Sequence, residues 1–151
     1  MNKILISSCF LGNKVRYDGQ TKVLVDPQIT TWQQQGCLVV ICPEMSGGLP
    51  VPRARAEQVG SKVIDEFAVD VTEQFQRGAS YALELCQKQQ IKFALLKEYS
   101  PSCGSSQIYN GHFNGTKVDG QGVTAKLLSE HGIAVYSELT LEQLIRDYTE
   151  Q

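Results

Sequence analysis

Three of the five cysteines stand where a short apolar run of strand length comes to an end. Cys9, Cys42 and Cys103 each follow such a run, and proline or glycine lies within three residues of every one of them. Runs of this kind are typical of buried strands, and the breaker residues end the strand. If the three strands lie parallel in one sheet, their carboxyl ends share an edge, which is where open α/β sheets bind ligands. The spacing therefore predicts three thiols gathered at one edge of a sheet.

Three separated thiols fit three kinds of chemistry. They could hold an iron–sulfur cluster with one iron left without a protein ligand, or a zinc ion with one open position. They could also supply one covalent nucleophile, but a nucleophile needs an adjacent base. The two histidines, His112 and His131, are expected in a hairpin and at a helix end, which weakens this third option. Spacing alone does not separate zinc from iron–sulfur, so the residues predict a metal or cluster site.

The other two cysteines, Cys37 and Cys86, are predicted to be packing residues. Cys37 stands at the beginning of the second apolar run, at the end opposite to the expected site. Cys86 continues an apolar stripe, spaced by three to four residues, along a helix that Asp70 opens. An odd number of cysteines prevents complete internal disulfide pairing, and in a reducing compartment thiols at turns are more often metal-binding or catalytic.

Polar side chains accompany the three thiols. Glu44 is two residues from Cys42 and within reach of whatever that thiol holds. Ser100 and Ser102 come with Cys103 in the sequence Ser-Pro-Ser-Cys-Gly. These side chains are candidates for proton exchange and for hydrogen bonding to a ligand.

Two further loops contain candidate substrate-binding residues. Arg16 and Asp18 lie in the loop after the first strand, where the plainer alternative is an Asp-Gly turn with a solvated arginine. Arg53 lies in the long loop 43–57, which is rich in proline and glycine, and Arg55 follows it. Either arginine could hold an anionic or planar polar substrate, or could pair with Glu57 or Asp65.

The remaining pattern alternates strands with helices. We expect helices after Asp26-Pro27, from Asp70, over 123–131 and from Thr140, together with a fourth core strand at 133–136. Asn110-Gly111 predicts a small hairpin after the third cysteine, with 112–113 in its second strand. The fold predicted is an α/β single three-layer domain over 1–151, with a mainly parallel, Rossmann-like sheet.

Bulk properties exclude several classes of function. The chain has 151 residues with 14 Lys and Arg against 16 Asp and Glu, which gives no electrostatic reason to expect nucleic acid as a partner. No apolar run approaches the roughly 20 residues needed to cross a bilayer, so we expect no membrane partner either. The first residues lead directly into a strand pattern without the form of a signal peptide, so a cytoplasmic location is expected. The oligomeric state is not fixed by the sequence.

Several motifs together resemble those of the DUF523 family, which includes the 2-thiouracil desulfurases, and the resemblance extends over essentially the whole chain. The motifs are Ser8-Cys9-Phe-Leu-Gly12, Val15-Arg-Tyr-Asp-Gly19, Cys42-Pro-Glu-Met-Ser-Gly-Gly-Leu-Pro-Val-Pro-Arg53, Ser100-Pro-Ser-Cys-Gly104 and Gly120-Gln-Gly-Val123. The resemblance implies a [4Fe-4S] cluster bound by three cysteines, which match Cys9, Cys42 and Cys103 here. One departure is Val15, where many relatives have a second cysteine.

The resemblance also implies a function, namely non-redox desulfuration of a small thiolated heterocycle such as 2-thiouracil, with release of sulfide. Glu44 and Ser100 match positions associated with catalysis, and the open iron would take the substrate sulfur. Arg16, Asp18, Arg53 and Ser102 are expected to complete the substrate pocket. The alternatives are a non-catalytic iron–sulfur sensor or sulfur carrier, and a zinc-dependent hydrolase that uses the same three cysteines.

Overall fold

Four short strands form a parallel sheet in the computed structural model, which describes residues 2–14 and 16–150. Hydrogen bonding places the strands in the order β2-β1-β5-β8, so the predicted parallel sheet is confirmed. All of β1 is buried, as its unbroken apolar sequence predicts. The strands are β1 (Ile4–Ser7), β2 (Leu38–Ile41), β5 (Phe93–Leu95) and β8 (Ala134–Tyr136).

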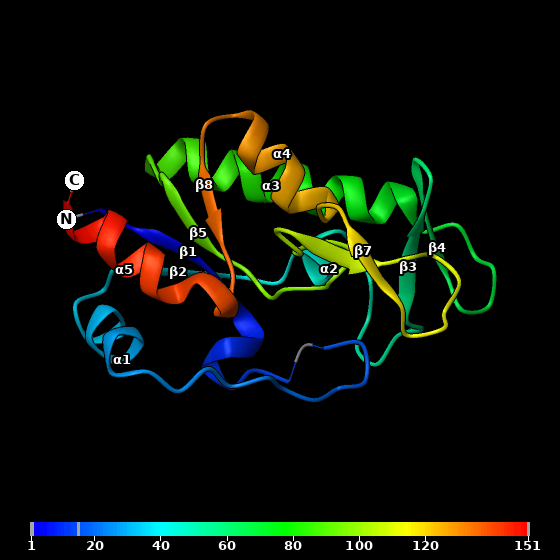
Figure 1. Cartoon of the computed structure of the whole chain (residues 1–151), viewed down its shortest axis with the longest axis horizontal. Helices are drawn as coiled ribbons and strands as arrows, with labels where there is room; N and C mark the ends of the chain where they lie inside the picture. Colours follow the sequence, from blue (N-terminus) through cyan, green and yellow to red (C-terminus); the bar gives the residue numbers. More distant parts are fainter. Residues whose placement is uncertain (1, 15, 151) are drawn as a thin grey trace.

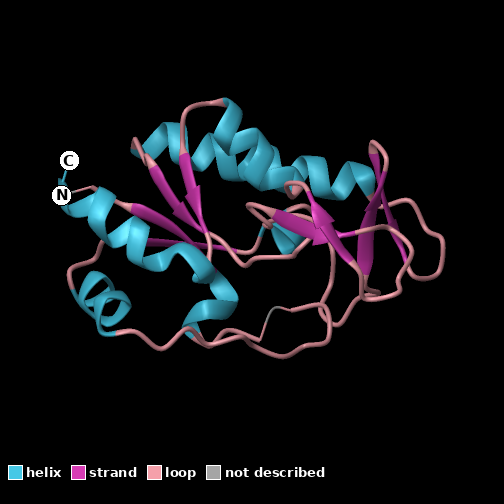
Figure 2. Ribbon diagram, in the orientation of Figure 1, coloured by secondary structure: helices cyan, strands magenta, loops and turns pink. Residues whose placement is uncertain are grey.

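Helices cover both faces of the sheet, which confirms the three-layer architecture (Figures 1 and 2). The side chains of alternate residues of β1 pack on opposite faces of the sheet. Ile4 and Ile6 pack with the layer of α1 and α5, and Leu5 packs with the layer of α3 and α4. None of the described helices is long and apolar enough to cross a membrane. The helices of these two layers are α1 (Pro27–Gln34), α3 (Thr72–Gln89), α4 (Val123–Glu130) and α5 (Leu141–Glu150).

Polar side chains define the ends of these helices. The carboxylate of Asp26 accepts a hydrogen bond from the amide of Gln28 at 2.8 Å and so caps α1, as predicted. Asp70 accepts from the amide of Thr72 at 2.9 Å at the beginning of α3. The ring of His131 hydrogen-bonds to the carbonyl group at the end of α4, so this histidine has a capping role.

Two antiparallel hairpins lie beyond the carboxyl ends of the sheet strands. One joins β3 (Ala56–Val59) to β4 (Lys62–Asp65), and the other joins β6 (Gln107–Tyr109) to β7 (Lys117–Asp119). The second hairpin confirms the prediction of a hairpin after the third cysteine. The strands β3, β4 and β7 and one short helix, α2 (Pro43–Ser46), lie in segments for which the sequence predicted no definite structure.

The turn of the second hairpin is longer than predicted. Tyr109 pairs with Lys117, so residues 112–113 lie in the turn and not in a strand. The amides of Gly111 and Phe113 both donate to the carboxylate of Glu57, at 2.9 and 3.2 Å. This distant carboxylate fixes the turn, and Phe113 adopts a φ of 53° there.

The sheet has a topological switch point beside β1. From β1 the chain continues to β2 on one side, and it later returns to β5 on the other side. Open α/β sheets bind ligands at such a point, in the crevice outside the carboxyl ends of the strands. Cys9 follows β1, Cys42 follows β2 and Cys103 follows β5, so all three predicted thiols belong to this edge.

Candidate active site

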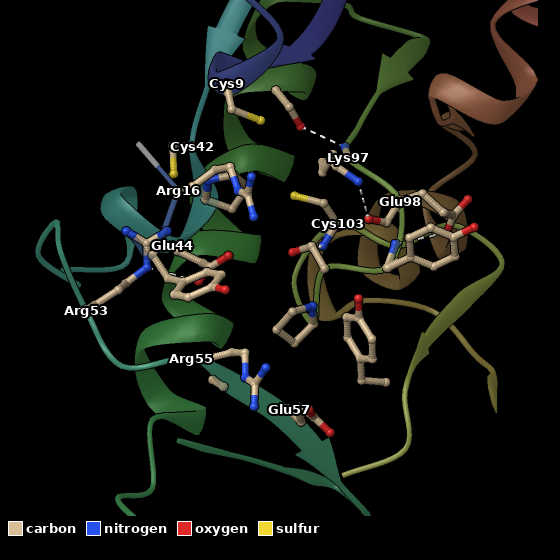
Figure 3. A pocket seen from close by; sticks show the side chains of 18 of the residues that line it. Cys9, Arg16, Cys42, Glu44, Arg53, Arg55, Glu57, Lys97, Glu98 and Cys103 are labelled. Carbon is tan, nitrogen blue, oxygen red and sulfur yellow. Dashed lines mark hydrogen bonds and ion pairs between the residues drawn. The ribbon is translucent and has the colours of Figure 1, made fainter. Parts of the chain in front are cut away.

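A cavity of about 280 Å³ lies at this edge of the sheet, and Cys9, Cys42 and Cys103 all line it. Figure 3 shows their sulfur atoms directed into the same space from three separate segments of the chain. Cys9 belongs to the apolar layer beneath α1 and α5, whereas Cys103 belongs to the layer beneath α3 and α4. The cavity therefore lies where the two core layers meet, and it receives one thiol from each.

Cys9 lies in a 3₁₀ turn over Ser8–Leu11 that continues directly from β1. Its carbonyl oxygen accepts hydrogen bonds from the hydroxyl of Thr21 at 2.6 Å and from the amide of Lys22 at 3.2 Å. Thr21 and Lys22 thus hold the backbone of Cys9 in place.

Cys42 is the N-cap residue of α2, with Pro43 in the first helical turn. This short helix packs backbone to backbone against α3. A Cβ atom on Gly78 would lie 1.9 Å from the carbonyl oxygen of Pro43, and one on Gly47 would lie 1.9 Å from the carbonyl oxygen of Gln74. The position of Cys42 is therefore fixed by contact between two helices.

Cys103 lies in a tight turn that the hydroxyl of Ser100 organises. Ser100 Oγ accepts hydrogen bonds from the amides of Ser102 at 3.1 Å and Cys103 at 3.2 Å. Gly122 packs on the same turn, where a Cβ would lie 2.5 Å from the nitrogen of Cys103. The predicted strand end is thus a turn enclosed by the beginning of α4.

Burial raises the pKa of all three thiols. The pKa of Cys9 is raised to about 11 by burial and by nearby Cys42, although Lys97 lowers it in part. Burial is also the largest cause for Cys42 and for Cys103, and Cys103 is further affected by Glu44 and Cys42. The protein alone therefore favours neutral thiols, and a bound cation would have to displace their protons.

The donor set suits a cluster with several metal atoms. In 2–14 and 16–150, no three Cys, His, Asp or Glu side chains are placed to hold one metal ion. Each thiolate of an iron–sulfur cluster binds a different iron, so the three sulfur atoms need to surround a space and not a single point. Three soft donors around one cavity meet that requirement, with Cys9 and Cys103 buried and Cys42 partly buried.

Glu44 lines the cavity beside the thiols, and its partner is Arg53. Arg53 Nε donates to Glu44 Oε1 at 3.1 Å, and both side chains are largely buried. The sequence had suggested Glu57 or Asp65 as partners for the two arginines. The structure instead pairs Arg53 with Glu44, and Arg55 with Glu66 at 3.9 Å.

Ser100 and Arg16 also line the cavity, as predicted, but Asp18 and Ser102 are not among its lining residues. The hydroxyl of Ser102 lies 2.8 Å from that of Thr124 in α4, on the buried side of the turn. Its side chain also lowers the pKa of the Cys103 thiol in part, against the larger effect of burial. Asp18 accepts from the amide of Gln20 at 3.0 Å and pairs with Arg16 at 3.7 Å. Val15, where the sequence departs from many DUF523 relatives, lies outside the described residues.

Several lining residues were not among the expected site residues, although Arg55 had been considered as a possible binder of a polar substrate. Lys97 and Glu98 precede the Ser-Pro-Ser-Cys-Gly motif, and Arg55 and Glu57 come from the first small hairpin. The amine of Lys97 lies 2.7 Å from a carboxylate oxygen of Glu138. The signal that could have found Lys97 and Glu98 is their position next to the motif, directly after the buried strand.

Comparison with known proteins agrees with this site. The family described as 2-thiouracil desulfurase matches residues 4–140. An uncharacterized protein of Bacillus subtilis (strain 168), YbbK, is 38% identical over 94% of this chain and 99% of its own length. A solved structure named [4Fe-4S]-dependent thiouracil desulfidase TudS is 48% identical, with a TM-score of 0.98 and full coverage of both chains. The chain therefore belongs to the 2-thiouracil desulfurase family, as the motif resemblance implied.

Proposed function

We propose that this protein is a [4Fe-4S]-dependent enzyme that removes sulfur from a small thiolated heterocycle such as 2-thiouracil. One observation carries the proposal: three thiols from three strand ends line the same cavity as a carboxylate and a hydroxyl group. The similarity to TudS over the full length of both chains supports it. A reducing compartment such as the cytoplasm suits a protein that depends on thiols.

Cys9, Cys42 and Cys103 would hold the cluster, and their three thiolates leave one iron without a protein ligand. When bound, the cluster supplies a Lewis acid that polarises the thiocarbonyl group and accepts its sulfur. Water supplies the oxygen that replaces sulfur on carbon, and sulfide is released. The carbon keeps its oxidation state, so no external electron donor is required.

Glu44 is placed to move the proton that this exchange requires. Arg53 binds Oε1 of its carboxylate, and no hydrogen bond within the described residues reaches Oε2. Arg53 thus orients the carboxylate, while Oε2 can accept a proton from water or return one to a ring nitrogen. Arg53 also lines the cavity, so in this scheme it orients Glu44 and can donate to the substrate.

Ser100 can donate a hydrogen bond while it holds the Cys103 turn. Its oxygen accepts from two backbone amides, and its hydroxyl hydrogen remains available for the heterocycle or the attacking water. Arg16 lines the same cavity and can donate to a planar polar ring. We assign Asp18 and Ser102 supporting roles, Asp18 through Arg16 and Ser102 through Cys103.

The test is anaerobic reconstitution with iron and sulfide, followed by measurement of iron per chain, visible absorption and sulfide release. Several thiolated pyrimidines serve as substrates, and a chain with Cys9, Cys42 and Cys103 replaced by Ala serves as control. A brown protein that releases sulfide from at least one thiopyrimidine supports the proposal. A colourless zinc protein with hydrolase activity would contradict it, as would a stable cluster that releases no sulfide.

A further inference from the structure

A buried carboxylate outside the proposed chemistry holds the loop that contains Cys103. Glu98 is 2% exposed, and its Oε1 accepts hydrogen bonds from the amides of Ser105, Ser106 and Gln107 at 2.9, 3.1 and 3.3 Å. Its Oε2 accepts from the hydroxyls of Ser105 at 2.9 Å and Ser106 at 3.2 Å. One side chain thus closes residues 98–107 into a loop, with Cys103 inside it.

The other end of this connection is anchored to the sheet. The backbone amide of Glu98 donates to Glu138 Oε1 at 2.7 Å, and that of Lys97 donates to the hydroxyl of Ser7 at 3.0 Å. Ser7 is the last residue of β1, the strand that leads to Cys9. Glu98 therefore ties the loop of Cys103 to a segment that is itself held, through the neighbouring Lys97, at the strand end that leads to another proposed ligand.

The charge of Glu98 strengthens these bonds. Burial alone would raise the pKa of Glu98, but the hydrogen bonds from Ser106, Ser105 and their neighbours outweigh it and lower the pKa to about 2. The side chain is therefore a carboxylate at neutral pH, and hydrogen bonds to a charged acceptor are stronger than neutral ones.

We propose that Glu98 is a positioning residue that keeps the Cys103 loop closed, so that this thiol stands ready for the cluster before the cluster arrives. Residues 101–104 also accept backbone hydrogen bonds from the first residues of α4 on one side of the loop. Glu98 holds the other side, at residues 105–107, so its loss should let that side open locally while the sheet stays folded. The expected effect of Glu98 on cluster retention rests on the function proposed above. Its effect on closure of the loop can be measured in the cluster-free protein.

Glu57 offers a matched control within the same molecule. It is also 2% exposed and also accepts from loop amides, those of Gly111 and Phe113. The turn that it fixes contains no cysteine. Removing either carboxylate takes the hydrogen-bond acceptor from loop amides, but only the loss of Glu98 should change the surroundings of Cys103.

The first experiment measures alkylation of each cysteine in the cluster-free protein by iodoacetamide, followed by peptide mass spectrometry. Glu98→Ala should raise the rate at Cys103 by about tenfold or more, the scale of losing several charge-assisted bonds. The rates at Cys37 and Cys86, which report global opening, should stay as in the wild type, and Glu57→Ala should leave Cys103 unchanged. Glu98→Gln removes the same charge but keeps a hydrogen-bonding side chain, so its rate should fall between those of the wild type and Glu98→Ala.

The second experiment follows loss of visible absorption from the reconstituted protein in the presence of an iron chelator. Glu98→Ala should lose its cluster several-fold faster than either the wild type or Glu57→Ala. If wild-type protein takes up no iron, the proposed function fails, while the alkylation rates still decide whether Glu98 closes the loop.

Three results would overturn the role of Glu98: an unchanged alkylation rate at Cys103, equal increases at Cys37 and Cys86, or equal increases in Glu57→Ala. If alkylation at Cys103 is faster but the cluster is lost at the wild-type rate, Glu98 has no role in retaining the cluster. If Glu98→Ala does not fold, the double variant Ser105→Ala, Ser106→Ala replaces it. This variant removes two hydrogen bonds from the opposite side and keeps the carboxylate, so a smaller increase at Cys103 is expected.

Discussion

The five cysteines form two groups, and among the four buried ones exposure hardly distinguishes the groups, while the cavity residue Cys42 is partly buried. Cys37 and Cys86 are each 1% exposed, and the cavity residues Cys9 and Cys103 are only slightly more open, at 7% and 5%. Burial is the largest cause that raises the pKa of Cys9 and Cys103, and nearby thiols raise it further, whereas burial alone raises the pKa of Cys86. Burial of a thiol therefore says little about its function. Proximity to other thiols at a shared cavity is the informative property.

The backbone explains how the two groups arise. Each cavity cysteine follows the carboxyl end of a parallel strand, where three separate segments must meet. Cys86 lies on the buried stripe of α3, and Cys37 lies just before β2, where the hydroxyl of Tyr148 contacts its sulfur at 3.7 Å. The same residue type thus has different surroundings at the two ends of the sheet.

The largest expected effect comes from Cys103→Ala. Two thiolates should hold the cluster too weakly to survive purification, so iron and sulfide-releasing activity should disappear together. Iron analysis and visible absorption of the anaerobically reconstituted variant provide the measurement. Full retention of a four-iron cluster in this variant would show that Cys103 is not a ligand. The distinction between cavity cysteines and core cysteines would then be wrong.

Glu44→Gln should separate cluster binding from chemistry. The variant keeps the size of the side chain and a hydrogen bond to Arg53, but it has no carboxylate to exchange a proton. We expect wild-type iron content and a turnover rate lower by about 10²-fold, the usual scale for a general acid or base. The rate of sulfide release at saturating substrate is the measurement. A wild-type rate would show that Glu44 is a structural residue of its loop.

The free energy of unfolding should depend on alkaline pH through the buried thiol of Cys86. The pKa of Cys86 is raised from 9.0 to about 11, so the folded state disfavours its thiolate. Its contribution to stability is complete below pH 9 and is lost as pH rises toward 11, by up to about 2–3 kcal/mol. Urea unfolding of the cluster-free protein should therefore show a steeper decline in the wild type than in Cys86→Ala. Parallel pH profiles of the two proteins would contradict this.

The smallest effect is expected from serine at the core positions. Cys86→Ser places a hydroxyl group in the apolar layer beneath α3, which should lower the free energy of unfolding by about 1–3 kcal/mol. Iron per chain should stay at the wild-type value, and Cys37→Ser should behave in the same way. Chemical denaturation and iron analysis of the purified variants test both statements. Loss of iron from a well-folded Cys86→Ser would show that this thiol belongs with the cavity cysteines.

Local sequence signals were sufficient for the sheet and for the three thiols. Apolar runs that end at proline or glycine identified the strands before Cys9, Cys42 and Cys103, because burial and chain reversal both leave marks in nearby residues. The turn at 110–116 was predicted too short, since the carboxylate of Glu57 that fixes it comes from a strand more than 50 residues earlier. Contacts of this kind leave no local pattern.

The candidate site shows the same limit. Glu44 could be found because it stands two residues from Cys42, and Ser100 because it belongs to the Cys103 motif. The sequence could not show that Arg53 pairs with Glu44, since several acidic residues lie near Arg53 in the chain. Ser102 was expected in the pocket, but neighbouring residues of a tight turn face different sides, and its hydroxyl contacts α4.

The glycine crossing between α2 and α3 has a consequence for protein design. Because Gly47 and Gly78 allow the two backbones to touch, the placement of Cys42 and Glu44 depends on a helix that contributes no group to the cavity. Grafting the three cysteines and the glutamate onto another parallel sheet would transfer the ligands without this support. A successful graft would have to include the helix crossing, with Gly47 and Gly78 both retained.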